Sequence, residues 1–268
     1  MKKNQSYFAP QIKYGMISLI VGIGIYTLLT NLYLYINVKS IFLLSIFRPQ
    51  YLPSPQIIWH KMVDLCVGRV IWQNIFISVV RVLLGYICGV TIGISLGLLM
   101  GWYKKVDLYI DPLIQILRPI PPLAFVTLFT LWFGIGEISK ILIIMQTAAV
   151  VTLIPAYQGV KSVASIYIDA ARCLGANDKL IFRKIVLPSA MPYIIAGLRI
   201  ALGLCWAVIV AAEYIASTRG LGFQIIWYQR LMSIDGVIVG IVWLGIIVYV
   251  FDTLFRHCIF NPILKWME

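Results

Sequence analysis

Long apolar stretches separated by short polar segments dominate the chain. Windows of about 20 residues with few charges fall at residues 15–37, 75–102, 112–134, 138–158, 191–215 and 237–256. An α-helix of about this length crosses the hydrocarbon core of a bilayer. The pattern therefore predicts an all-α membrane protein with about six transmembrane helices.

The composition argues against a water-soluble enzyme. Of the 268 residues, 61% are hydrophobic and 12% are charged, and the mean hydropathy is +0.93. Soluble domains are about half apolar and about a quarter charged. The formal net charge of +12 is explained better by basic cytoplasmic segments of a membrane protein than by nucleic-acid binding. We therefore expect a lipid bilayer and no nucleic acid as a partner.

The distribution of Lys and Arg predicts the orientation. If the N-terminus is cytoplasmic, twelve of these residues lie on inner segments and seven on outer segments, as the positive-inside rule favours. The uncharged run Tyr14–Val38 is 25 residues long and has no cleavage pattern behind it, so we interpret it as a retained helix rather than a signal peptide. The sequence thus predicts a cytoplasmic N-terminal segment (1–14), one transmembrane domain (15–256) and a cytoplasmic tail (257–268).

Two segments outside the spans have a distinct pattern. Residues 52–74 begin with "LPSP" and continue with Ile58, Met62 and Leu65 at helical spacing among polar residues. This pattern predicts an external amphipathic helix along the membrane face. Residues 158–190 contain the longest polar inner loop. A loop of this length in so compact a protein favours a docking element over a passive connection.

Glycine and proline mark two of the spans. The second span carries five glycines four residues apart, which predicts a groove for close helix packing or, alternatively, a smooth face that slides or lines a pathway. The third span carries "RPIPPLAF", whose prolines interrupt the helical hydrogen bonds. The resulting kink is either structural or pathway-lining. The glycines are Gly85, Gly89, Gly93, Gly97 and Gly101, and the prolines are Pro119, Pro121 and Pro122.

Four ionisable residues lie inside the spans, where charge is costly. Arg81, Arg118, Arg199 and Glu213 either snorkel or pair, or else they face a wet pathway. Arg199 and Glu213 are 14 residues apart, which predicts one helix face and a separation of about 21 Å. Arg118, Arg199 and Glu213, with Pro121 and Pro122, are therefore candidate pathway residues for an anion or a zwitterion.

The sequence gives little sign of catalytic or metal chemistry. The cysteines Cys66, Cys88, Cys173, Cys205 and Cys258 form no CxxC pair, which favours buried inert thiols over disulfides or zinc. Neither an HExxH nor a GxxxxGK[ST] sequence occurs, so we expect no metal and no nucleotide site of this chain's own. Ser95 lies in a GxSxG match, but it is in mid-helix without a nearby base, so a membrane-embedded hydrolase is not favoured.

The inner loop contains the most specific pattern, "DAARCLGANDKLIFRKIVLP" over residues 169–188. We expect a short helix with Asp169 near its start and a sharp chain reversal at Gly175. A second short helix should then be capped by Asn177 or Asp178 and end before Pro188. Two helices that meet at a glycine corner would make a compact knob on the cytoplasmic face.

This segment resembles the EAA loop of permease subunits of ATP-binding cassette importers. That pattern is EAA, three residues, Gly, nine residues, Ile, one residue and Leu-Pro. Six of its seven positions are identical here, and the seventh has Asp for Glu. The resemblance implies that this loop docks in a groove of a separate ATPase, which binds ATP and Mg, while this chain needs no cofactor. The matching residues are Asp169, Ala170, Ala171, Gly175, Ile185, Leu187 and Pro188.

The resemblance extends from Leu52 onward. "DPLIQILRPIPPLAF", "LWFGIGEISKILII" and "AAEYIASTRGLGF" look like permeases for nitrate, bicarbonate, aliphatic sulfonates and taurine, and most like the taurine branch. Relatives also carry pyrimidine precursors of thiamine. The resemblance implies a second copy of this chain, two cytoplasmic ATPases and an external solute-binding protein, in a bacterial plasma (inner) membrane. The competing class is an ion-gradient transporter or channel, for which Glu213 and Asp252 are the plausible coupling carboxylates.

Overall fold

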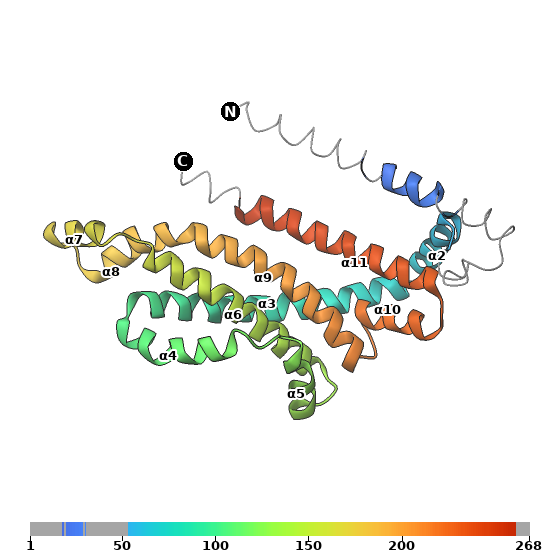
Figure 1. Cartoon of the computed structure of the whole chain (residues 1–268), viewed down its shortest axis with the longest axis horizontal. Coiled ribbons are helices and arrows are strands. Elements are labelled where there is room, and N and C mark those ends of the chain that lie inside the picture. The colour runs from blue at the N-terminus through green and yellow to red at the C-terminus, as the bar shows by residue number, and fades with distance from the viewer. Residues whose placement is uncertain (1–17, 19, 29, 31–52, 261–268) are drawn as a thin grey trace, which may run out of the picture. The chain divides into compact units, whose positions relative to one another are not determined.

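The computed structural model describes residues 18, 20–28, 30 and 53–260, and the regular structure in these residues is helical (Figure 1). This confirms the all-α class. The segment 1–14 predicted at the N-terminus, most of the first expected span and the end of the tail lie outside the described residues. The chain divides into two compact units, Met1–Gly68 with Tyr228–Val239, and Arg69–Trp227 with Gly240–Glu268. The two units are described separately.

Four helical stretches in the described residues are long and apolar enough to cross a membrane, namely Val70–Trp102, Glu137–Lys161, Asp178–Ala216 and Ile234–Cys258. Two short π-helical segments, Phe182–Val186 and Arg256–Phe260, interrupt or follow the α-helices. In chain order the α-helices are α2 (Pro55–Val67), α3 (Val70–Trp102), α4 (Lys104–Leu117), α5 (Ala124–Phe133), α6 (Glu137–Lys161), α7 (Ser165–Cys173), α8 (Asp178–Ile181), α9 (Leu187–Ala216), α10 (Leu221–Arg230) and α11 (Ile234–Phe255).

The first unit contains the helix expected in residues 52–74. Helix α2 begins at Pro55, where a proline is favoured because its fixed φ suits the first helical position. The expected stripe of Ile58, Met62 and Leu65 is half-buried. Within the same unit, the Lys61 ammonium lies 5.2 Å from the centre of the Tyr228 ring.

The second unit is built on α3, α6 and α9, which pack against one another (Figure 1). The five glycines of α3 all face α6. A Cβ added at Gly89 or Gly93 would collide with a backbone carbonyl oxygen of α6, and one added at Gly101 would collide with Val160. Small residues in such a row let two helix backbones approach closely. The glycine stripe therefore lies in the α3–α6 contact.

Replacing Gly93 with alanine should lower the free energy of unfolding by about 1–3 kcal/mol, because the added methyl group must push α3 away from α6. The matched control is Gly245→Ala in α11, where an added Cβ meets nothing within 4 Å. Both changes bring a similar gain in helix propensity, so only the contact differs. Thermal unfolding of the purified protein in detergent measures the difference. Equal melting temperatures for the two variants would contradict this account of the α3–α6 contact.

The third expected span, 112–134, is not one continuous helix. Helix α4 ends at Leu117 and α5 begins at Ala124, because the intervening prolines cannot donate to the helical ladder. In their place, the Ala124 and Phe125 amides donate to the Pro121 and Pro122 carbonyls at 3.0 and 3.1 Å. Helix α5 has 10 residues and is too short to cross a bilayer alone. The interruption expected from the prolines is therefore present, and it divides the expected span into two separate helices.

Candidate functional site

A knob formed by α7, the turn at Gly175 and α8 (residues 165–181) joins α6 to α9. The sharp reversal expected at Gly175 is present, with a φ of +82°. The Ala176 amide donates to the Ala171 carbonyl at 3.0 Å, and the Gly175 amide donates to the Arg172 carbonyl at 2.9 Å. These two bonds are those of a Schellman cap, in which glycine takes the left-handed position. The knob is therefore held by backbone geometry at one glycine.

The start and end of the knob differ from expectation. Asp169 is the fifth residue of α7 rather than near its start, because the helix begins at Ser165. Asn177 caps α8 by accepting from the Leu180 amide at 2.9 Å. The second helix does not end before Pro188. A π-helical turn over Phe182–Val186 continues it into α9, and its wider ring accommodates a proline that has no N–H to donate.

The knob has an inner face and an outer face. On the inner face Ala171 packs, together with Ile185 and Leu187 of the segment that follows the knob, on a cluster formed by the ends of α6 and α9 with α8 and Val186. On the outer face Leu174 is 88% exposed, and Ile166 and Tyr167 are also exposed. The residues of α7 and its turn lie outside the candidate spans, so these apolar side chains would meet water. Exposed apolar groups of this size mark a surface that a partner covers.

The remaining loop residues lie on the outer side or at its base. Asp169 and Ala170 are exposed, and the Asp169 carboxylate is 3.8 Å from the Arg172 guanidinium. Arg172 also bonds to the Asp178 carboxylate at 3.3 Å. Pro188 is half-buried in the first turn of α9. The outer face thus carries apolar side chains ringed by charges of both signs.

Glu213 lies in a buried polar network rather than on an open surface. Its side chain is 0% exposed and accepts from the Arg81 guanidinium and the Ser78 hydroxyl, both at 2.7 Å. It also accepts from the Gly222 amide at 2.8 Å. Arg81 in turn makes a bidentate pair with Glu137 at the start of α6. This network joins α3, α6, α9 and the turn before α10.

The charges of this network balance. Lys140 is buried one turn after Glu137 and donates to the Gly136 carbonyl at 3.0 Å. With Lys140 included, two basic and two acidic groups cancel formally. Although the 14-residue spacing predicts one helix face for Arg199 and Glu213, their surroundings differ, since Glu213 is buried and Arg199 is 47% exposed. The residues packed against a long helix change along its length, and a spacing of 14 residues in the sequence does not show which neighbours each position has.

Three cavities lined by residues outside the Arg81 network share lining residues with one another. The first, of about 520 Å³, and the second, of about 370 Å³, both contain Arg118 and Ile154. The second also contains Pro122 and Leu204, and Leu204 lines the third, of about 470 Å³, with Arg199. The three cavities are therefore neighbours, each sharing at least one lining residue with the next. Pro121 is exposed in that break but is not among the lining residues.

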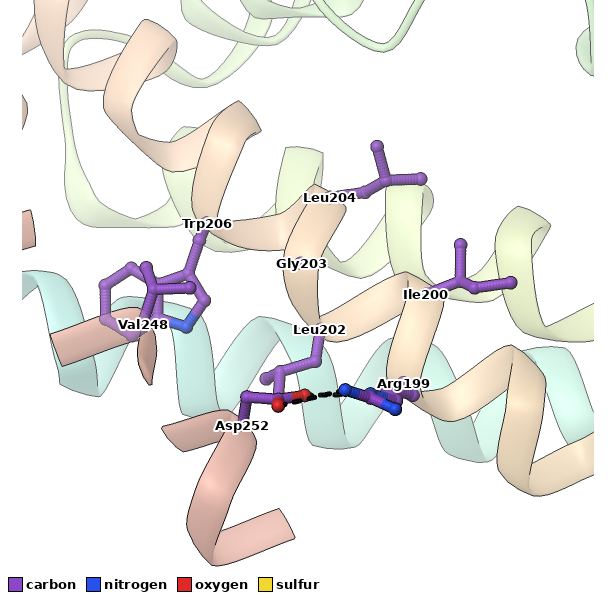
Figure 2. Close-up of a pocket in the computed structure, with 8 residues that line it drawn as sticks. All are labelled: Arg199, Ile200, Leu202, Gly203, Leu204, Trp206, Val248 and Asp252. Carbon is purple, nitrogen blue, oxygen red and sulfur yellow. Dashed lines mark hydrogen bonds and ion pairs between the residues drawn. The ribbon is translucent and has the colours of Figure 1, made fainter. Parts of the chain in front are cut away.

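The third cavity holds an ion pair that sequence spacing could not reveal. Arg199 of α9 donates to the Asp252 carboxylate of α11 at 2.9 and 3.1 Å (Figure 2). Arg256 bonds to the same carboxylate at 3.1 Å, which leaves one net positive charge. Arg199 remains 47% exposed. Because charge facing lipid is costly, this open side needs water or protein against it.

Two other expectations concern metals and thiols. Among residues 18, 20–28, 30 and 53–260, no group of three or more His, Cys, Asp or Glu side chains could hold a metal. In the same residues the cysteines form no disulfide. Cys205 is buried as expected, but Cys88, Cys173 and Cys258 are exposed, because they lie on the outer sides of their helices. The expectation of generally buried thiols was wrong.

Comparison with known proteins identifies similar chains. A family model described as "Binding-protein-dependent transport system inner membrane component" matches residues 89–259. The taurine transport system permease protein TauC of Escherichia coli (strain K12) is 38% identical over 214 residues, covering 78% of each chain. The putative aliphatic sulfonates transport permease protein SsuC of Bacillus subtilis (strain 168) is 32% identical over 223 residues, covering 83% of this chain and 80% of SsuC.

Two further comparisons concern a bicarbonate permease and a solved structure. The bicarbonate transport system permease protein CmpB of Synechococcus elongatus is 38% identical over 184 residues, covering 68% of this chain and 65% of CmpB. Among solved structures, a crystal structure of "an amino acid ABC transporter with histidines" superposes with a TM-score of 0.60 at 16% identity. It covers 73% of this chain and 95% of that chain. At this identity the likeness shows a shared fold.

Proposed function

Since the chain belongs to the family of binding-protein-dependent transport system inner membrane components, we propose that it forms the pathway for a small anionic or zwitterionic solute. Taurine or another sulfonate is our first choice of solute. The chain is the permease component of an ATP-binding cassette importer, is not an enzyme, and works with an ATPase that binds the nucleotide. The supporting observation is the set of three neighbouring cavities, whose linings include Arg118 and Arg199, while the charges of the Arg81 network cancel.

The knob is our candidate for coupling to the ATPase. The seven loop residues Asp169, Ala170, Ala171, Gly175, Ile185, Leu187 and Pro188 would transmit the closure of the ATPase dimer to α6 and α9. The packing of Ala171, Ile185 and Leu187 on the helix ends supports this role, because a rigid base passes on displacement. The exposed apolar side chains of the outer face would then be covered by the ATPase.

The assembly we propose contains a second copy of this chain, a cytoplasmic ATPase dimer and an external solute-binding protein. It lies in a bacterial inner membrane, with about six spans in each copy and both termini in the cytoplasm. Inward and outward access would alternate as a shift between two states, biased by nucleotide and by the loaded binding protein. The half-exposed Arg199–Asp252 pair favours a second copy or a wet pathway on that side.

Two alternatives remain in the proposal. The similarity to CmpB favours bicarbonate as a second substrate, and nitrate or a thiamine-precursor pyrimidine would use the same machinery. An ion-gradient transporter is less favoured. Its plausible coupling carboxylates, Glu213 and Asp252, are already bonded to arginines, which leaves neither open to carry a coupling ion.

Solute uptake into proteoliposomes tests the proposal. The vesicles would contain this chain with its ATPase, and the binding protein would be added outside with labelled taurine, ethanesulfonate, nitrate or bicarbonate. We expect taurine or ethanesulfonate to accumulate only when ATP and the binding protein are both present. Accumulation of nitrate or bicarbonate alone would contradict the sulfonate assignment. Uptake driven by an ion gradient without ATP would contradict the importer mechanism.

A further inference from the structure

The second cavity lies between the break after α4 and the helices α6 and α9. Its volume is about 370 Å³. Its lining contains three polar residues, Arg118, Gln146 and Thr147, and is otherwise apolar, with Ile120, Val150, Val151, Ile154, Pro155 and Leu204 among the apolar residues. Ligand sites commonly combine apolar walls with a few placed polar groups. The chemistry of these polar groups therefore indicates what could bind.

Arg118 is the cation of this cavity. It is exposed, and in the part of the chain that the structure describes its guanidinium makes no hydrogen bond or ion pair, while its backbone amide donates to the Ile114 carbonyl at 2.8 Å. Arg81 and Arg199, the other two arginines inside the expected spans, are both bonded to carboxylates. Ile154, seven residues before the end of α6, lines the same cavity. An arginine inside an expected span whose guanidinium has no carboxylate partner is available to an anion.

Gln146 supplies a second, different requirement. Its side-chain oxygen is buried and has no hydrogen-bond partner among the described residues. Thr147, the other polar group, is already engaged because its hydroxyl donates to the Ile143 carbonyl at 2.8 Å. A buried amide oxygen without a donor is unfavourable. A bound molecule that fits this cavity should therefore bring an N–H or O–H group as well as an anion.

We infer that this cavity binds an amino-sulfonate zwitterion during transport, with its sulfonate on Arg118, its short aliphatic part against the apolar walls and its ammonium on Gln146. This rests on the proposed function and narrows its substrate class. Nitrate and bicarbonate have no aliphatic part to cover those walls. A phosphodiester would satisfy Arg118 but carries no donor for Gln146, and an anionic lipid brings both only if its headgroup adds donors, as the hydroxyl groups of phosphatidylglycerol do.

Protection of an introduced thiol tests the site without ATP or the binding protein. Leu204 lines this cavity and points away from the Arg199–Asp252 pair (Figure 2). In the complex with its ATPase in nanodiscs, Leu204→Cys would be alkylated with N-ethylmaleimide, and mass spectrometry would follow the label at position 204. We expect taurine to slow labelling at lower concentration than ethanesulfonate, while nitrate and bicarbonate have no effect.

A second substitution, added to Leu204→Cys, tests the sulfonate contact and the ammonium contact separately. Adding Arg118→Gln should raise the half-protecting taurine concentration at least about tenfold, since a charge-assisted contact is lost, while Arg118→Lys should restore part of it. Adding Gln146→Leu should raise the half-protecting concentration of taurine about tenfold. The half-protecting concentration of ethanesulfonate, which has no ammonium, should stay unchanged. The control is Lys105→Gln, which removes an exposed positive charge from helix α4, just before Arg118 in the chain, and should change neither the taurine nor the ethanesulfonate concentration that gives half protection.

Three outcomes would overturn the site. These are protection that Arg118→Gln leaves intact, protection by nitrate equal to that by taurine, and labelling that depends on phosphatidylglycerol content but not on taurine. The last would assign the cavity to lipid. If protection follows the expected pattern but the complex fails to accumulate taurine with ATP, the proposed function is wrong and the binding site stands.

Discussion

Replacing Arg81 with methionine is expected to destabilise the protein by about 3–5 kcal/mol, the range for removing one partner of a buried ion pair. Arg81 is 2% exposed and bonds to Glu137, Glu213 and the Arg219 carbonyl. Without it, the Glu213 carboxylate stays buried with only a hydroxyl and an amide as donors. Thermal unfolding in detergent or loss of purified complex measures the change.

The double variant Arg81→Met with Glu213→Leu should recover part of that loss, because both buried charges are then removed. The matched control is Glu137→Gln. The Glu137 side chain is 59% exposed, so water can replace its partner and the loss should stay below about 1 kcal/mol. A double variant no more stable than Arg81→Met alone would show that the network does not act as a charge pair.

Replacing Gly175 with valine should abolish coupling to the ATPase. A β-branched residue is strained at a φ of +82°, at a cost of about 1–2 kcal/mol or more, so the turn between α7 and α8 should change course. Space is not the reason, because a Cβ at Gly175 meets nothing within 4 Å. The outer face would then be misplaced, and we expect at least about tenfold weaker ATPase binding. Co-purification of the ATPase and ATP hydrolysis stimulated by loaded binding protein are the measurements.

Gly175→Asn is the matched control, since asparagine tolerates the left-handed conformation. It should retain ATPase binding and stimulated hydrolysis. The melting temperature of the chain should remain near that of the wild type in both variants, because the knob lies outside the α3–α6–α9 bundle. Normal assembly and stimulated hydrolysis in Gly175→Val would remove the knob from the coupling mechanism.

Much of the fold could be predicted from the sequence, because apolar length and glycine spacing are local properties. The row from Gly85 to Gly101 indicated a close helix contact, and the structure has it against α6. The third span was harder. Its apolar length and its prolines indicated one kinked span, whereas Pro119, Pro121 and Pro122 divide it into the separate helices α4 and α5. Hydropathy measures affinity for lipid and does not measure whether the backbone can stay helical.

The candidate site was predictable where its signal is local and unpredictable where partners are distant. The turn at Gly175 follows from one residue type at a helix end. The pairing of Arg199 with Asp252 joins residues 53 apart in sequence, and Arg81 with Glu213 joins residues 132 apart. Helical spacing relates residues of one helix only, so it placed Arg199 and Glu213 together although their surroundings differ. Gln146 gave no signal, because only the fold shows that its amide oxygen lacks a donor.

The ratio of taurine molecules accumulated to ATP molecules hydrolysed tests the central claim most directly. It would be measured in proteoliposomes with the ATPase and the binding protein, for the wild type, Arg118→Gln and Gly175→Val, with and without an imposed proton or sodium gradient. The account predicts a fixed ratio in the wild type that no gradient alters, hydrolysis without uptake in Arg118→Gln, and neither activity in Gly175→Val. Taurine accumulation that follows the ion gradient and continues without ATP would contradict it.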